Sequence, residues 1–185
     1  MPFYNIKPVG DLTNLEILII LDLWNIDAWK FMEPSEFKSR FRESEIHFLK
    51  DEKDSILCIA RISFNFTLKI SGADYYFTEF AGLASAQKHK GFGLMLIEHI
   101  IENMLERNLD SIGFCDKKLR PFYDKSGVAL IQNAAGFIFQ QSDGELVKSS
   151  LDDIIVVNLR DSHYKQLAAL DEQNFAILIL QNNEL

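Results

Sequence analysis

An anion could be held by the basic, glycine-bearing segment Lys88-His89-Lys90-Gly91-Phe92-Gly93-Leu94. Glycines allow the backbone to approach a bound group closely, and the first N–H groups of a helix have no partner within that helix. These N–H groups and the positive end of the helix dipole attract phosphate groups. A Gly-x-Gly pattern occurs in many unrelated turns, so its meaning depends on the elements on either side.

The segment lies between a predicted strand and a predicted helix. Residues 75–84 form an apolar run, and residues 94–107 carry apolar side chains at helical spacing. Upstream, apolar and polar side chains alternate towards the end of residues 56–70, and residues 71–74 have turn chemistry. A long antiparallel hairpin is therefore expected to lead into the glycine-bearing segment, which gives the strand–turn–helix order of a phosphate-binding corner.

The composition narrows the class of protein. The chain has 185 residues, 48% of them hydrophobic, which suits the core of one domain. Its net charge of −8 argues against a general nucleic-acid binder, which needs a basic surface. Cys58 and Cys115 lie in apolar runs without metal-ligand spacing, so buried thiols and no metal site are expected. With no signal peptide and no apolar stretch long enough to cross a bilayer, a cytoplasmic protein without membrane contact is predicted.

Downstream, a short helix ended by Gly127 in a left-handed cap is predicted for Leu119-Arg120-Pro121-Phe122-Tyr123-Asp124-Lys125-Ser126-Gly127. The two segments together resemble the two signatures of the GCN5-related N-acetyltransferases (GNAT family). The first signature has a basic or amide residue, Gly, and Gly or Ala, here Lys88, Gly91 and Gly93. The second has an aromatic pair followed by a basic residue and Gly. Lys88 replaces the commoner Arg or Gln, which keeps a charge but changes the hydrogen-bond geometry.

The resemblance implies that acetyl-CoA is the co-substrate and that no metal is required. Backbone N–H groups from about Lys88 to Leu94 would hold its pyrophosphate. The strand before the signature would splay from its neighbour and pair with the pantetheine arm. Gly82 is consistent with a bulge there, although a packing role is equally open. The donor-binding residues that follow are Leu83, Ala84, Ser85, Lys88, His89, Lys90, Gly91, Phe92, Gly93 and Leu94.

Acetyl transfer to an amine needs a base for the amine and a proton for the departing thiolate. Tyr123 matches the general acid of the family, although it could instead be a buried aromatic partner of Phe122. Glu79, on the strand entering the first signature, could be the base directly or through water, or could simply be an ion-paired strand residue. The amine would attack directly in a ternary complex, so no Cys or Ser nucleophile is expected.

A narrower resemblance, to the aminoglycoside 2′-N-acetyltransferases, covers about residues 10–160. It rests on the long hairpin, the Pro121-Phe122-Tyr123 helix and a late acidic turn. It implies that carboxylates hold a cationic amine. One of them lies between Trp24 and Trp29, where charge and ring stacking could bind a sugar, although Trp24 could instead end the first helix in the core. The implied substrate-binding residues are Asp27, Asp152 and Asp153.

The predicted fold class is α/β (α+β). The GNAT fold implies a mixed, mostly antiparallel central sheet, helices on both faces and a splayed strand pair at the acyl-CoA site. Residues 1–160 would form the N-acetyltransferase domain. Residues 161–185 would form a C-terminal helical extension, because residues 164–180 have helical spacing of apolar side chains. This extension could pack on the domain or on a second copy, which would make a homodimer.

The predicted function is an acetyl-CoA-dependent N-acetyltransferase acting on a primary amine, such as an aminoglycoside-like or other cationic small molecule. A polyamine, an amino acid and a protein N-terminus remain open as other acceptors. A different class, a catalytically silent acyl-CoA-binding or regulatory domain, also remains open. A generic nucleotide-binding corner is disfavoured, because a Rossmann unit alternates parallel strands with helices and does not begin with a long hairpin.

Overall fold

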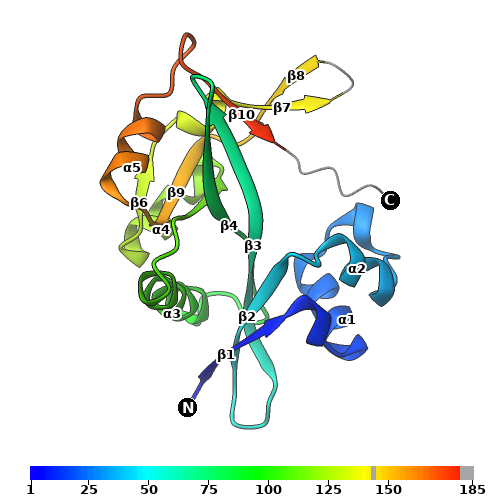
Figure 1. The fold of residues 1–185 in the computed structure, drawn as a ribbon. Coiled ribbons are helices and arrows are strands. Elements are labelled where there is room, and N and C mark those ends of the chain that lie inside the picture. The colour runs from blue at the N-terminus through cyan, green and yellow to red at the C-terminus, as the bar shows by residue number, and fades with distance from the viewer. Residues whose placement is uncertain (143–144, 180–185) are drawn as a thin grey trace. The chain divides into compact units, whose positions relative to one another are not determined.

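The computed structural model describes residues 1–142 and 145–179, and Figure 1 shows the course of the chain. The chain divides into two compact units. Strands β3 and β4 and helix α3 each contribute residues to both units. The first unit contains Met1–Ser63 and Ala81–Ile100, and the second contains Phe64–Phe80 and Ile101 onward.

The first unit is built on three antiparallel strands. Strand β2 pairs with β1 on one side and with the first half of β3 on the other. Helices α1 and α2 lie on one side of these strands, and the beginning of α3 lies on the other (Figure 1). The elements are β1 (Phe3–Pro8), α1 (Asn14–Trp24), α2 (Pro34–Arg40), β2 (Ser44–Lys50), β3 (Ile56–Ile70), β4 (Ala73–Ser85) and α3 (Phe92–Glu106), with single 3-10 turns at Val9–Asp11 and Asp27–Trp29.

Local sequence signals set the starts of the first two helices. Thr13 and Glu16 form a capping box at the start of α1, in which each side chain accepts a hydrogen bond from the other residue's backbone N–H. Pro34 occupies the first turn of α2, where its missing N–H costs nothing. Residues next to or within the first turn therefore set both helix starts.

The core of the first unit lies between β2 and the two helices. Ile46 and Phe48 alternate along β2 and pack against a cluster that includes Ile17, Ile20 and Phe37, all of them fully buried. On the other face, Tyr4 of β1 stacks on His99 of α3, with ring centroids 4.9 Å apart. Helices thus cover both faces of these strands, as the predicted fold requires.

The second unit contains a mixed sheet with strand order β6-β9-β5-β4-β3-β10-β7-β8. The pairs β4–β5 and β10–β7 are parallel, whereas β6–β9, β9–β5, β3–β10 and β7–β8 are antiparallel. The predicted mixed, mostly antiparallel sheet is confirmed. Its further elements are β5 (Ser111–Cys115), α4 (Arg120–Ser126), β6 (Ala129–Ile131), β7 (Ile138–Ser142), β8 (Glu145–Lys148), β9 (Asp153–Asn158), α5 (Asp161–Ala168) and β10 (Ala176–Ile179), with 3-10 turns at Lys117–Leu119 and Ala134–Phe137.

The parallel pairing between β4 and β5 is short. It joins Thr78–Phe80 to Ser111–Gly113, and β4 runs on to Ser85 beyond the last of these pairs. On its other side β5 pairs with β9 along its whole length, from Ser111 to Cys115. A strand pair that meets over three residues and then ends is the arrangement predicted for the splayed pair.

The tail differs from the predicted helix. Helix α5 ends at Ala168, and Ala176–Ile179 form strand β10 between β3 and β7. A short apolar run fits either a helix or a buried strand. Here hydrogen bonding to the backbone groups of β3 and β7 favours the strand. Residues 180–185 lie outside the described part of the chain, and the domain boundary at residue 160 stays a prediction. Within the described residues, no helix is long and apolar enough to span a membrane.

Candidate functional site

The end of β4 is anchored to β3 just before the glycine-bearing segment. The backbone N–H of Ala86 donates to the carbonyl of Leu57 over 2.9 Å. The hydroxyl of Ser85 lies 3.2 Å from the same carbonyl and 3.0 Å from that of Gln87. Ala84 packs on the core of the first unit. These contacts fix where the strand stops and the turn begins.

The turn itself is exposed and has the backbone conformation that an anion site needs. His89 and Gly91 both have positive φ, +62° and +79°. Left-handed residues alternating with others form the concave backbone nests that bind anions. Lys88 and Lys90 are exposed in the same turn, and they bring positive charge to it.

Helix α3 follows this turn directly. It begins at Phe92, so Phe92, Gly93 and Leu94 form its first turn, and the N–H of Met95 donates to the carbonyl of Gly91 over 3.1 Å. The N–H groups of a first helical turn have no partner within the helix. The structure therefore forms the predicted strand–turn–helix corner, and the donor-binding roles of its residues stay predictions.

Gly82, three residues before the end of β4, is a point of close backbone approach. Its φ is +64°, and its carbonyl accepts a 2.6 Å hydrogen bond from Nε1 of Trp24. A Cβ atom built on Gly82 would lie 2.7 Å from that same nitrogen. The close approach to Trp24 supports the packing role of this glycine, and the bulge stays a prediction. Trp24 ends α1 and packs among Trp29, Phe37 and Phe41.

Replacing Gly82 with Ala should destabilise the protein by about 2–3 kcal/mol. The left-handed conformation costs a non-glycine residue about 1–2 kcal/mol, and the contact with the indole of Trp24 adds overpacking. Chemical denaturation of wild type and variant measures the change. Gly72→Ala is the matched control, because Gly72 also has positive φ, +84°, but has open space around its Cβ position. Equal losses for both variants would remove the contact with Trp24 from the explanation.

Tyr123 lies in α4 and is buried, with 5% of its surface exposed. Its ring packs edge-on against Phe122, with centroids 5.1 Å apart. Burial raises the pKa of its hydroxyl above the ordinary value of 10, and the nearby thiol of Cys115 raises it further. Burial likewise raises the pKa of Cys115, to about 11, so this thiol stays protonated and is a poor nucleophile. Tyr123 can therefore hold its proton at any ordinary pH.

A buried ion pair holds the start of α4 in place. Arg120 donates from Nε and Nη2 to the two carboxylate oxygens of Asp153, over 2.6 and 2.7 Å. Asp153 is fully buried and also accepts from the backbone N–H of Asn133 over 2.8 Å. The hydrogen bonds from Arg120 lower the pKa of Asp153 against the opposing effect of burial. Asp153 therefore ties β9 to the helix that carries Tyr123.

The other carboxylates predicted to bind substrate lie in different surroundings. Asp152 accepts a hydrogen bond from the backbone N–H of Lys117 over 2.8 Å, and its own N–H donates to the carbonyl of Cys115. Asp27 begins an exposed 3-10 turn in the first unit and lines a pocket of about 450 Å³ with Lys30 and Phe31. The structure gives Asp152 a local structural contact, and the substrate-binding roles of all three carboxylates stay predictions.

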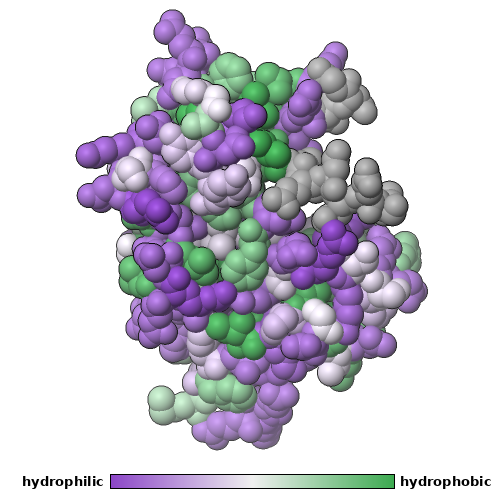
Figure 2. Space-filling model, viewed as in Figure 1, coloured by the Kyte–Doolittle hydropathy of each residue, from purple (hydrophilic) through white to green (hydrophobic). Residues whose placement is uncertain are grey.

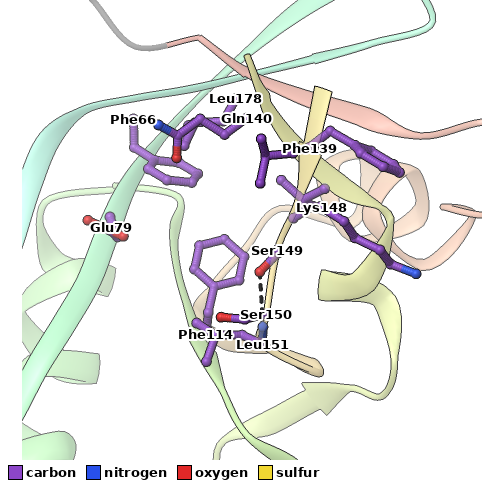
Figure 3. Close-up of a pocket in the computed structure, with 12 residues that line it drawn as sticks. Phe66, Glu79, Phe114, Phe139, Gln140, Lys148, Ser149, Ser150, Leu151 and Leu178 are labelled. Atoms are coloured by element: carbon purple, nitrogen blue, oxygen red, sulfur yellow. Dashed lines mark hydrogen bonds between the residues drawn. The ribbon is translucent and has the colours of Figure 1, made fainter. Parts of the chain in front are cut away.

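Glu79 lines a cavity of about 400 Å³ in the second unit. Phe66 of β3 and Phe114 of β5 line the same cavity, with ring centroids 5.6 Å apart (Figure 3). The other walls come from β7, β8, β10 and the segment after β8, including Gln140, Ser150 and Leu178. Sequence reasoning placed Glu79 but missed this cavity. The sequence indicates one part of the cavity wall, because the alternation along β3 puts Phe66 on one face of that strand.

No group of three or more His, Cys, Asp or Glu side chains that could hold a metal ion occurs in residues 1–142 and 145–179. Both cysteines are buried and unpaired with each other.

Comparison with known proteins rests on structure alone, since no protein-family model and no curated protein matches the sequence. A GNAT family N-acetyltransferase (YhbS) from Escherichia coli, solved in complex with CoA, is 13% identical and matches 96% of this chain and 88% of its own, with a TM-score of 0.56. An acyl-CoA N-acyltransferase from Pseudomonas aeruginosa is 11% identical, with 84% and 99% covered and a TM-score of 0.53.

The catalytic domain of the Tetrahymena GCN5 histone acetyltransferase, in complex with coenzyme A, is 15% identical, with 85% and 94% covered and a TM-score of 0.51. Identities this low carry information about the fold and not about the substrate. The resemblance read from the two signatures is thus confirmed at the level of architecture, and this chain has the fold of the GNAT N-acetyltransferases.

Proposed function

We propose that the protein is an acyl-CoA-dependent N-acyltransferase that moves an acetyl group to an amine. The observation that carries the proposal is the corner at Lys88–Leu94: the family's donor signature falls on an exposed turn with left-handed residues, between a strand and a fifteen-residue helix, in a GNAT fold. Strand β4 carries Glu79 and ends at Ser85, just before this corner.

Acetyl-CoA would supply an activated acetyl thioester to an amine bound nearby. The N–H groups at the start of α3, together with Lys88 and Lys90, would neutralise the charge of its pyrophosphate. The open space at the Cβ position of Gly91 leaves room for a phosphate against the backbone. Leu83 to Ser85 would offer backbone hydrogen bonds to the pantetheine arm.

In the reaction, the C–S bond of the thioester breaks while the new C–N bond forms. Glu79 would accept the proton that the amine loses, directly or through one water molecule. Tyr123 would donate its phenolic proton to the departing sulfur and recover one from solvent. Burial raises the pKa of this hydroxyl, which keeps its proton in place at the working pH but also makes it a weaker acid towards the departing thiolate. Asp153 is assigned to positioning α4, since its oxygens already accept hydrogen bonds from Arg120 and Asn133.

Coenzyme A should raise the melting temperature of the wild-type protein. Gly91→Ala should lower the apparent affinity for coenzyme A, obtained from the same thermal titration, about tenfold. At a ligand concentration 100 times Kd, binding adds about 2.7 kcal/mol of stability, which corresponds to about 5–10 °C for a chain of this size. Gly91→Ala forces the left-handed turn to rearrange at the place where the phosphate would lie.

Gly72→Ala is again the matched control, because Gly72 has the same kind of φ and open surroundings but lies in the β3–β4 turn. A thermal titration of all three proteins with coenzyme A makes the measurement. No shift at millimolar coenzyme A for the wild type would overturn the proposal. Thiol release from acetyl-CoA with a panel of amines then separates an enzyme from a catalytically silent acyl-CoA-binding domain.

A further inference from the structure

The cavity beside Glu79 has walls that come from six strands of the second unit and from the segment after β8. Strands β3, β4 and β5 contribute Phe66, Glu79 and Phe114. Strand β7 contributes the amide of Gln140, and Figure 3 shows this side chain next to the ring of Phe66. Leu178 of β10 completes a wall that consists mainly of apolar groups. A volume of about 400 Å³ is in the range of small-molecule sites.

The charges on this lining are few. Among the described residues that line the cavity, Glu79 and Lys148 are the two that carry charge. The ammonium of Lys148 lies over the ring of Phe137, 5.6 Å from its centroid, and Figure 3 shows its side chain extending away from Phe66 and Phe114. Its charge is therefore directed away from the aromatic part of the cavity, where Glu79 is the acidic group.

A polycation would fit such a lining badly. One ammonium group could pair with Glu79, but each further ammonium would lose its water against phenyl and aliphatic side chains without a second carboxylate. An apolar body would instead remove both itself and the side chains of Phe66, Phe114 and Leu178 from water. The face of a phenyl ring also attracts the single ammonium next to it.

We infer that this cavity binds the acceptor, and that the acceptor is a small monoamine carried on an aromatic or branched aliphatic group. The inference rests on the proposed N-acyltransferase function for its chemistry, and on the cavity alone for its specificity. Glu79 receives the amine, Phe66 and Phe114 contact its apolar body, and Gln140 and Ser150 contact a polar substituent. The β7–β8 hairpin and β10, which supply the outer wall, would then set the choice of acceptor.

The test compares 2-phenylethylamine with spermidine and kanamycin. Binding of each amine to the full-length protein is measured by equilibrium dialysis, with and without saturating coenzyme A, and acetylation is followed by thiol release from acetyl-CoA. We expect about tenfold or stronger preference for 2-phenylethylamine in both affinity and kcat/KM. Equal or better binding of spermidine or kanamycin would overturn the inference and support the aminoglycoside-like acceptor.

A cavity-filling variant locates the binding site. Ser150 is an exposed lining residue, and Figure 3 shows it beside Phe114, so Ser150→Trp should fill the cavity and weaken 2-phenylethylamine at least about tenfold. Ser162→Trp, at an exposed position of α5 that does not line the cavity, is the matched control and should bind the amine like the wild type.

The outcomes separate the two proposals. If 2-phenylethylamine binds with unchanged affinity to Ser150→Trp, the site is elsewhere and the inference fails, whatever coenzyme A does. If coenzyme A gives no thermal shift, the proposed acyltransferase function fails, whereas binding of the amine without coenzyme A still decides whether the cavity selects apolar monoamines.

Discussion

Tyr123→Phe should lower turnover about 100-fold and leave the thermal shift caused by coenzyme A unchanged. Proton transfer by a positioned side chain contributes about 10²–10⁴-fold, and phenylalanine removes the transferable proton but keeps the ring that packs on Phe122. Because burial raises the pKa of Tyr123, deprotonation of this residue should cause no loss of activity up to about pH 10 in the wild type.

The measurement is kcat from thiol release with the best amine of the panel, at saturating acetyl-CoA. Tyr164→Phe provides the matched control, since Tyr164 is exposed on α5 and loses the same hydroxyl. Turnover within a factor of about two of the wild type for Tyr123→Phe would remove this residue from the acid role. A lost coenzyme A shift would instead indicate that the variant disturbs the fold or the donor site.

Asp153→Asn should destabilise the protein by about 3 kcal/mol, which corresponds to a fall of about 6–12 °C in melting temperature. The substitution keeps the shape of the side chain but leaves the guanidinium of Arg120 without its paired charge. The value is at the lower end for a buried pair, because Arg120 keeps about a quarter of its side chain exposed, 26%, and can gain some water. Thermal and urea denaturation measure the effect.

Asp152→Asn is the control at the neighbouring position, where the carboxylate accepts one hydrogen bond from a backbone N–H, and it should cost about 1 kcal/mol or less. The pH dependence separates charge from shape. The pKa of Asp153 is lowered by folding, so its contribution is complete above the unfolded value of 3.8 and declines as pH falls through the folded value. Wild type and Asp153→Asn should therefore converge in stability below pH 3.8. A constant difference down to the acid transition would contradict the ion-pair explanation.

Local signals in the sequence were enough to place much of the fold. The Thr13–Glu16 capping box starts α1. Gly127 ends α4 in the left-handed conformation that the sequence predicts. These features depend on a few neighbouring residues, so they survive in any tertiary context. The alternation along β3 and the glycine corner before α3 are local in the same sense.

Features that depend on distant partners could not be read in this way. The sequence does not indicate that Asp153 pairs with Arg120, since the two residues come from different elements and only the packed structure brings them together. The cavity beside Glu79 has the same origin, because its walls come from strands between β3 and β10. The resemblance therefore points to acidic residues for the acceptor without indicating what surrounds them in the fold.

The C-terminal segment shows most clearly what the sequence alone cannot predict. Ala176–Ile179 consist of apolar side chains that suit a helix or a buried strand, and the periodicity of four residues cannot separate the two. Pairing with the edges of β3 and β7 selects the strand, and these two edges form only when the tertiary structure folds. A strand that is hydrogen-bonded on both sides gains more backbone partners than the last turn of a helix.

The position of β10 also has a consequence for biosynthesis. Its pairing with β3 joins Ala176 to Ile70, so β10 leaves the ribosome about a hundred residues after the strand that it must reach. Until then, the edges of β3 and β7 are exposed and open to wrong partners, including the same edges of other nascent chains. We therefore expect the protein to depend on chaperones during synthesis, and chains cut before Ala176 to aggregate, because β10 covers these edges late.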